Sequence, residues 1–133
     1  ELLAQGLPEV TMMLDEAPVV EPPAATVPAQ YVVRIQGKPF VLYAGLLQMA
    51  QARGLVELTA NWTYNDAGLS LAEAVATFSD GRHFRESGDA TPENVTRKVA
   101  PHFRRVALTR AKARCLRDAL GVELCAVEEL GED

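Results

Sequence analysis

Two hairpin-turn signals set between strand-like segments constrain the fold of this chain more than any other feature. From Val56 to Tyr64 every second residue is apolar, the alternation of a strand with one buried face. The segments 65–68 (NDAG) and 80–81 (DG) are typical of hairpin turns. A second strand-like segment, residues 69–79 (LSLAEAVATFS), lies between these turns, and a third, residues 82–87 (RHFRES), follows the second turn. The pattern predicts a meander of three antiparallel strands.

The residues before this meander predict one strand and one short helix. Residues 31–35 (YVVRI) are rich in β-branched side chains and are followed by the turn-like 36–38 (QGK). From Phe40 onward apolar residues recur at spacings of three and four, which indicates a short helix closed by Gly54 as its C-cap. We expect the first strand to join the meander.

Helical signals follow the meander. Thr91 and Pro92 are typical of an N-cap and a first helical position, and Pro101 interrupts the segment about ten residues later. We therefore expect a short helix, a kink or restart, and a long helix to Leu120 that Gly121 caps. The resulting order, β-α-β-β-β-α, predicts an α+β domain in which the helix covers one face of the sheet.

The chain of 133 residues divides into one domain and two acidic ends. Residues 18–29 hold four of the eight prolines and predict an extended linker. The expected division is an acidic, Pro-rich tail at 1–29, a domain at 30–122 and an acidic segment at 123–133. With no bilayer-length apolar run, no signal peptide and no CxxC pair, we expect a cytoplasmic protein without a membrane partner, in which Cys115 fills space on a helix.

Charge is segregated along the chain. The formal net charge is −5, yet residues 97–117 hold eight of the thirteen Lys and Arg residues and no acid. Residues 1–33 carry five acids and no base, and residues 118–133 carry six acids and no base. The local electrostatic potential, and not the net charge of the whole chain, decides whether a protein attracts an anion. The basic run is therefore the main functional signal.

On a helix this run forms two apolar stripes with cations between them. The stripes predict packing on two sides, one being a candidate subunit interface, and three guanidinium groups share the face between them. Their mutual repulsion requires compensation from outside the helix. Two interpretations remain open: a polyphosphate site, or ion pairs with the acidic C-terminal segment. The first stripe is Val106, Thr109, Ala113, Leu116 and Leu120, the second is Ala107, Ala111 and Cys115, and the cations are Arg110, Arg114 and Arg117.

Two motifs in this order resemble the Rad-fifty-two-type single-strand annealing proteins, a recombination family. Residues 74–90 (AVATFSDGRHFRESGDA) are similar to the family's strand, DG hairpin and following glycine. Residues 106–121 (VALTRAKARCLRDALG) are similar to its basic helix with a closing glycine. The resemblance covers roughly residues 30–122. It implies an oligomeric ring that holds single-stranded DNA in an outer basic groove, with no ATP, metal or other cofactor.

The resemblance also implies which residues contact phosphates. Trp62 and Tyr64 could stack on bases, but an apolar strand face is more often core, and we expect core. The implied contacts are Arg104, Arg105, Arg110, Lys112, Arg114 and Arg117 on the helix, Arg82 and Arg85 after the DG turn, and Lys38 before the first helix.

The leading hypothesis is thus a non-enzymatic protein that binds and anneals single-stranded DNA in recombination and repair. The sequence has no phosphate-binding glycine loop, and His83 and His102 lack ligand partners at metal-binding spacing. A metal-dependent nuclease built on Asp80, Glu86 and Asp89 is a third hypothesis. The alternative is a homo-oligomeric protein-interaction module, with the C-terminal segment as a possible partner site, whose basic helix is neutralised by Glu123, Glu128, Glu129, Glu132 and Asp133.

Overall fold

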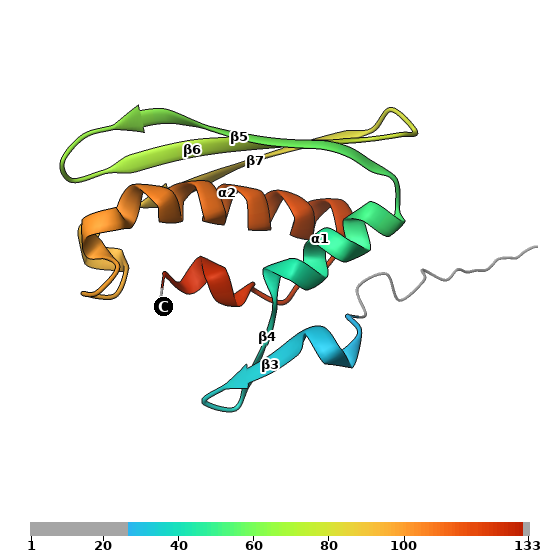
Figure 1. Ribbon diagram of the computed structural model, residues 1–133, viewed down its shortest axis with the longest axis horizontal. Coiled ribbons are helices and arrows are strands. Elements are labelled where there is room, and N and C mark those ends of the chain that lie inside the picture. The colour runs from blue at the N-terminus through green and yellow to red at the C-terminus, as the bar shows by residue number, and fades with distance from the viewer. Residues whose placement is uncertain (1–26, 132–133) are drawn as a thin grey trace, which may run out of the picture.

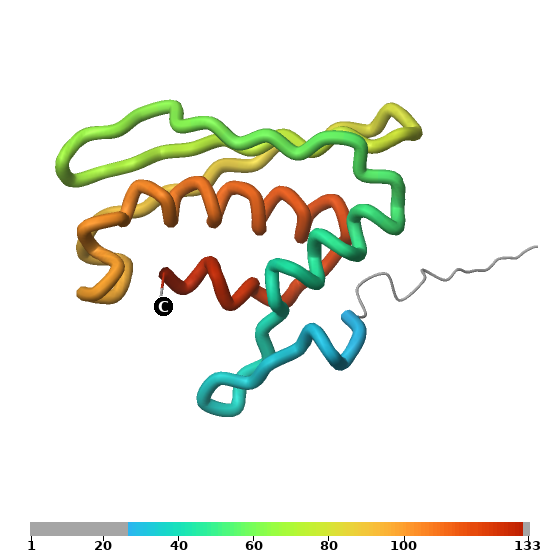
Figure 2. Tube along the Cα trace, in the orientation of Figure 1, coloured from blue at the N-terminus to red at the C-terminus, as the bar shows by residue number. Residues whose placement is uncertain are grey.

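The computed structural model describes residues 27–131 and shows an α+β fold with two antiparallel sheets (Figure 1, Figure 2). One sheet has two strands and the other three. The expected tail and linker, apart from residues 27–29, lie outside the described residues. The strands are β3 (Val32–Ile35), β4 (Lys38–Val41), β5 (Leu55–Asn65), β6 (Ser70–Phe78) and β7 (His83–Ala90), the helices are α1 (Tyr43–Ala52) and α2 (Phe103–Leu120), and single 3-10 turns are η2 (Ala29–Tyr31), η3 (Pro92–Asn94), η4 (Ala100–His102) and η5 (Val127–Leu130).

The predicted meander is confirmed, with strand order β5-β6-β7 and antiparallel pairing throughout. Asp66 builds the first turn, because its Oδ1 accepts hydrogen bonds from the backbone N–H groups of Gly68 and Leu69, both at 2.8 Å. Asp80 plays the same part in the second turn and accepts from the Arg82 N–H at 3.0 Å. Aspartate favours such turns because its short carboxylate reaches backbone donors two residues onward.

The expectation for the N-terminal part is wrong in two respects. β3 does not join the meander but pairs with β4 in a separate hairpin. Its turn places Gln36 and Gly37 at positive φ, 52° and 82°. Residues 38–41 are therefore a strand, and α1 begins only at Tyr43. The observed order is therefore β-β-α-β-β-β-α. The expectation failed because so short a segment fits a strand as well as the first turn of a helix.

The expected helix start at Thr91 is confirmed as a cap but not as a helix of ten residues. Thr91 Oγ1 accepts from the Asn94 N–H at 3.1 Å, and Asn94 Oδ1 accepts from the Thr91 N–H at 3.0 Å. The reciprocal cap closes a single 3-10 turn, after which Val95 returns to extended backbone. α2 begins only at Phe103, two residues after Pro101.

Helix α2 lies between the three-stranded sheet and a third layer made of α1 and the described part of the C-terminal segment, residues 123–131 (Figure 1). The two-sided packing predicted from its stripes is confirmed, and this chain supplies both layers. On the sheet side α2 crosses β7 at Gly88, where a Cβ would lie 2.3 Å from the Ala107 oxygen and the Ala111 nitrogen. Glycine is required there because only a backbone without a side chain permits this approach.

The C-terminal segment is tied to both hairpin and helices. The Val41 N–H donates to the Cys125 carbonyl at 3.0 Å, and Val41 forms a parallel bridge with Ala126. Glu128 Oε1 accepts from the Tyr43 N–H at 2.9 Å and so caps α1. Cys125 is a free thiol, as is the fully buried Cys115 on α2, as expected of a helix filler. Within residues 27–131 no helix is long and apolar enough to cross a membrane.

Candidate nucleic-acid interface

The nine predicted phosphate contacts do not form one surface. Three of them lie on the C-terminal half of α2 and form hydrogen bonds or ion pairs with other parts of the chain: Arg110, Arg114 and Arg117. Arg104 and Arg105 lie in its first turn, at the opposite end of the sheet from Arg82 and Arg85 (Figure 1). The two remaining residues, Lys38 and Lys112, are placed apart from both groups.

Arg110 is a buried structural side chain, 7% exposed. Its Nε donates to the Glu129 carbonyl at 2.6 Å, and its Nη2 donates to the Asn94 carbonyl at 3.0 Å. Nη1 donates to the Asp89 carbonyl at 3.0 Å and to Asn94 Oδ1 at 2.9 Å. Burial, with repulsion from Arg114, lowers the pKa of the Arg110 guanidinium. Because four of its five N–H groups donate within the chain and the side chain is buried, Arg110 is held by the fold and is not presented to a phosphate in this conformation.

Glu129 neutralises the next two arginines. Its carboxylate, 4% exposed, accepts from Arg117 Nη2 at 2.9 Å and lies 3.6 Å from Arg114 Nε. Arg117 Nε lies 2.9 Å from Glu129 Oε2 but is not aligned for a hydrogen bond, so this second contact is an ion pair only. Arg114 also pairs with Asp89 at 3.2 Å. The compensation that the helix required therefore comes from the same chain, from Glu129 of the C-terminal segment and Asp89 of β7.

The hairpin arginines are also partnered. Arg82 pairs with Asp80 at 2.8 Å, and its guanidinium lies 5.6 Å from the centre of the Phe84 ring. Arg85 pairs with Glu73 at 2.9 Å across β6 and β7, on the face turned away from α2. These exposed pairs contribute little stability, so a phosphate could compete for either cation.

Lys38 and Lys112 belong to other parts of the surface. Lys38 is exposed at the start of β4, in the hairpin furthest from the large sheet. Lys112 is half-buried, with its ammonium 5.8 Å from the centre of the Tyr43 ring. Neither lies beside the first turn of α2.

The basic residues of the first turn of α2 and of the segment before it form a further exposed group, which we call the basic end of α2. Arg97, His102 and Arg105 are exposed, and among residues 27–131 neither Arg97 nor Arg105 has an ion-pair or side-chain hydrogen-bond partner. Sequence reasoning left out Arg97, Lys98 and His102, although the acid-free run contained them. The basic end of α2 consists of Arg97, Lys98, His102, Arg104 and Arg105.

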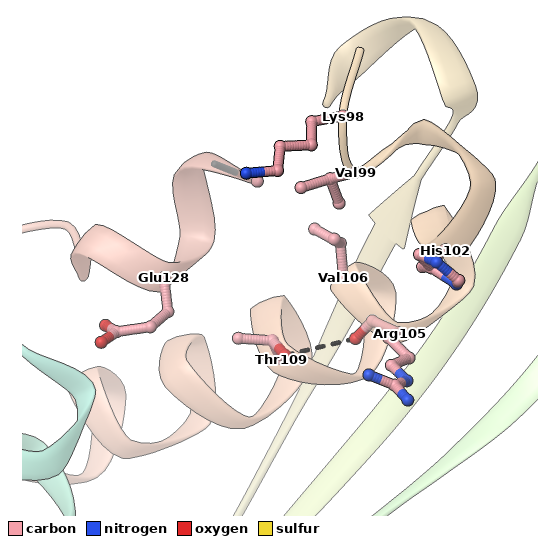
Figure 3. A pocket seen from close by; sticks show the side chains of 8 residues that line it. Lys98, Val99, His102, Arg105, Val106, Thr109 and Glu128 are labelled. Carbon is pink, nitrogen blue, oxygen red and sulfur yellow. Dashed lines mark hydrogen bonds between the residues drawn. The ribbon is translucent and has the colours of Figure 1, made fainter. Parts of the chain in front are cut away.

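A groove of about 510 Å³ adjoins this end, between α2, the segment before it and η5 (Figure 3). His102 and Arg105 lie at one side of it, and Glu128 lies at the other. Val99 and Val106 face the space between them. The groove thus has an apolar floor and a rim that is mainly basic. Its lining residues are Lys98, Val99, His102, Arg105, Val106, Thr109, Glu128 and Gly131.

Trp62 and Tyr64 are not core residues, so that expectation is wrong. Their exposed fractions are 46% and 47%. A bulge between them changes the strand register, so Trp62 pairs with Ala72 on the α2 side and Tyr64 pairs with Leu71 on the outer side. A second bulge leaves Val56 67% exposed. Alternation alone could not reveal these register shifts.

The hydroxyl of Tyr64 is bound at the hairpin tip. It donates to Asp66 Oδ2 at 2.6 Å, and this hydrogen bond is the main cause that raises the pKa of Tyr64 and lowers the pKa of Asp66. Residues 27–131 contain no group of three or more His, Cys, Asp or Glu side chains that could hold a metal ion.

Comparison of the chain with protein-family profiles, with characterised proteins and with solved structures gives no significant match. Membership of the Rad-fifty-two-type family therefore stays a prediction, supported by the two motifs.

Proposed function

We propose that this chain binds single-stranded DNA through the basic end of α2 and anneals complementary strands, without ATP, as a ring-type homo-oligomer. One observation carries the proposal: Arg105 in the first turn of α2 and Arg97 in the segment before it are exposed, and neither has an ion-pair or side-chain hydrogen-bond partner among the described residues. The positive end of the helix dipole disfavours cations there, so helix stability does not explain them. A bound phosphate would relieve both the repulsion between cations and the conflict with the dipole.

The charge balance of the domain supports the same ligand. Residues 27–131 hold all thirteen Lys and Arg residues but only eleven of the eighteen acids. The domain is thus weakly basic although the whole chain is acidic. Phosphate contacts of this kind give affinity that depends on salt and not on base sequence, as annealing of arbitrary strands requires.

The test is a fluorescence-anisotropy titration with a long, unstructured DNA strand at low and moderate salt. We expect Arg105→Ala to weaken binding about three- to tenfold at low salt and to lower the salt slope by about 1. Arg53→Ala is the matched control, because Arg53 is another exposed cation without a partner among the described residues, at the end of α1. It should leave the affinity unchanged.

Two results would contradict the proposal. Negligible binding by the folded native chain at low salt would exclude nucleic-acid binding. Equal losses in Arg105→Ala and Arg53→Ala would indicate a diffuse charge effect instead of a site. Annealing itself is measured by the rate at which two complementary labelled strands pair, with and without the protein.

The second candidate, a homo-oligomeric interaction module, is supported by a different observation. β5 and β7 each have one edge without a partner strand within the described chain, and β5 is eleven residues long. Such an edge favours pairing with another chain. Light scattering distinguishes the candidates: an oligomer that fails to bind DNA would support the module alone, and a monomer would contradict both.

A further inference from the structure

The position of Trp62 beside the basic end of α2 carries an inference that rests on the proposed function. Its indole Nε1 donates to the Arg104 carbonyl at 2.9 Å, which fixes the ring against the first turn of α2. The ring is nevertheless 46% exposed. An indole that is held by its polar edge and open to solvent offers a flat surface to a ligand at little entropic cost.

Arg104, whose carbonyl accepts the hydrogen bond from Trp62, also binds the hairpin through its own side chain. Its Nη2 donates to the Asp66 carbonyl at 2.6 Å, and its guanidinium lies 4.7 Å from the centre of the Phe103 ring. The tip of the β5–β6 hairpin and the start of α2 are therefore joined by two hydrogen bonds, one from each partner. Trp62 is held by fold contacts, not by a ligand, and its exposed surface is ready before any ligand arrives.

We propose that the exposed indole of Trp62 is a nucleobase-stacking site, which receives a base from the strand whose phosphates lie on the basic end of α2. Every base has an aromatic face, so stacking adds affinity without sequence preference. An aromatic ring beside cations matches the two parts of a nucleotide, a flat apolar base and an anionic phosphate. Trp62 is also the single tryptophan of the chain, so its fluorescence reports on this site alone.

The opposite face of the hairpin supplies the matched control. Tyr64 is as exposed as Trp62, at 47% against 46%, and lies two residues along the same strand. The intervening bulge turns it to the outer face of the sheet, beside Leu71 and away from α2. A stacking role for Trp62 predicts that Tyr64 contributes nothing to the same site.

The first experiment measures Trp62 fluorescence during titration with oligothymidylate and with an abasic deoxyribose-phosphate chain of the same length. Both carry the same charge, but only the first has bases. We expect oligothymidylate to quench the fluorescence and to bind more tightly than the abasic chain. Equal affinity for the two chains, or no change in fluorescence while anisotropy reports binding, would overturn the stacking site and leave the proposed function intact.

The second experiment compares variants by anisotropy with oligothymidylate. Trp62→Leu should weaken binding about 5- to 140-fold, and Trp62→Phe, which keeps an aromatic face but loses the N–H donor, should retain most of the affinity. Tyr64→Leu should bind as the native chain does. Native affinity in Trp62→Leu, or equal losses in Trp62→Leu and Tyr64→Leu, would overturn the inference. Absence of binding by the folded native chain would overturn it together with the proposed function.

Discussion

Glu129 and Arg117, twelve residues apart in sequence, form a carboxylate–guanidinium pair at 2.9 Å that joins the C-terminal segment to α2. The Glu129 side chain is 4% exposed and that of Arg117 is 22% exposed. One carboxylate thereby compensates two arginines that would otherwise repel each other along the helix. The acid-free run of the sequence is thus divided in space, into a neutralised half and the exposed basic end of α2.

We expect Glu129→Gln to lower the free energy of unfolding by about 2 kcal/mol, because hydrogen bonds to charged partners contribute about 1.5–3 kcal/mol each. The change leaves Arg117 without a counter-charge and Arg114 with Asp89 alone, although partial exposure of both arginines limits the cost. Urea unfolding followed by circular dichroism measures the effect. Glu123→Gln is the control, since Glu123 is exposed and has no partner among residues 27–131, and should change stability by less than about 0.5 kcal/mol.

The same substitution separates structural from ligand-binding cations. If the basic end of α2 carries DNA binding, Glu129→Gln should bind DNA as well as the native chain does, or more tightly, because Arg117 is released and Arg114 keeps only Asp89. A large loss of affinity in a variant that is still folded would place the site on the C-terminal half of α2.

Arg110→Lys should destabilise the chain by about 2–4 kcal/mol, although it preserves the charge. A lysine ammonium cannot reproduce the fork that reaches the carbonyls of Asp89, Asn94 and Glu129 together. One buried and two partly buried carbonyls left without donors account for the cost. The measurement is a thermal melt and a urea titration. Native stability in this variant would show that the hydrogen bonds from Arg110 to the three carbonyls contribute nothing. Circular dichroism of the variant then shows whether any reduced DNA binding reflects loss of folding.

Gly88→Ala should cost about 3 kcal/mol or prevent folding, because its Cβ would lie 2.3 Å from two backbone atoms of α2. Relief requires the helix to move away from β7 as a unit, since the atoms it meets belong to the backbone. Gly68→Ala is the control: its Cβ would meet nothing closer than 3.9 Å, and its φ is not positive. Similar melting temperatures for the two variants would contradict the close approach.

The meander and the end of α2 were predictable because local chemistry decides them. Aspartates at 66 and 80 close their turns through their own side chains, and Gly121 adopts positive φ, 71°, at the helix end. The β3–β4 hairpin was missed because residues 38–41 carry no alternation that distinguishes a strand from a helical turn. The pairing of this hairpin with the C-terminal segment joins residues that are distant in sequence, and no local pattern predicts it.

The candidate site was predictable only as a charge run. The sequence places Arg105 and Arg110 on the same helix, but Arg110 is buried and Arg105 is exposed, because Asn94 and Glu129 accept hydrogen bonds from Arg110 and not from Arg105. Burial of a guanidinium depends on which backbone carbonyls converge on it, and that is a property of the tertiary structure. The exposure of Trp62 and Tyr64 likewise accompanies a bulge between them, which the alternation of apolar residues does not reveal.

The thiol of Cys115 should make stability depend on pH in the alkaline range. Burial raises the pKa of Cys115 from 9.0 to about 11. The folded chain therefore keeps a proton that the unfolded chain releases between those values, so the stabilising contribution is complete below pH 9.0 and is lost as the pH rises toward about 11. We expect the difference in free energy of unfolding between the native chain and Cys115→Ala to shrink over this window, as urea titrations at stepped pH would record. The comparison cancels groups common to both chains, including Tyr43, whose pKa burial also raises. A difference that stays constant through the window would mean that the Cys115 thiolate is accommodated in the core, beside the Phe84 carbonyl that the thiol contacts at 3.2 Å.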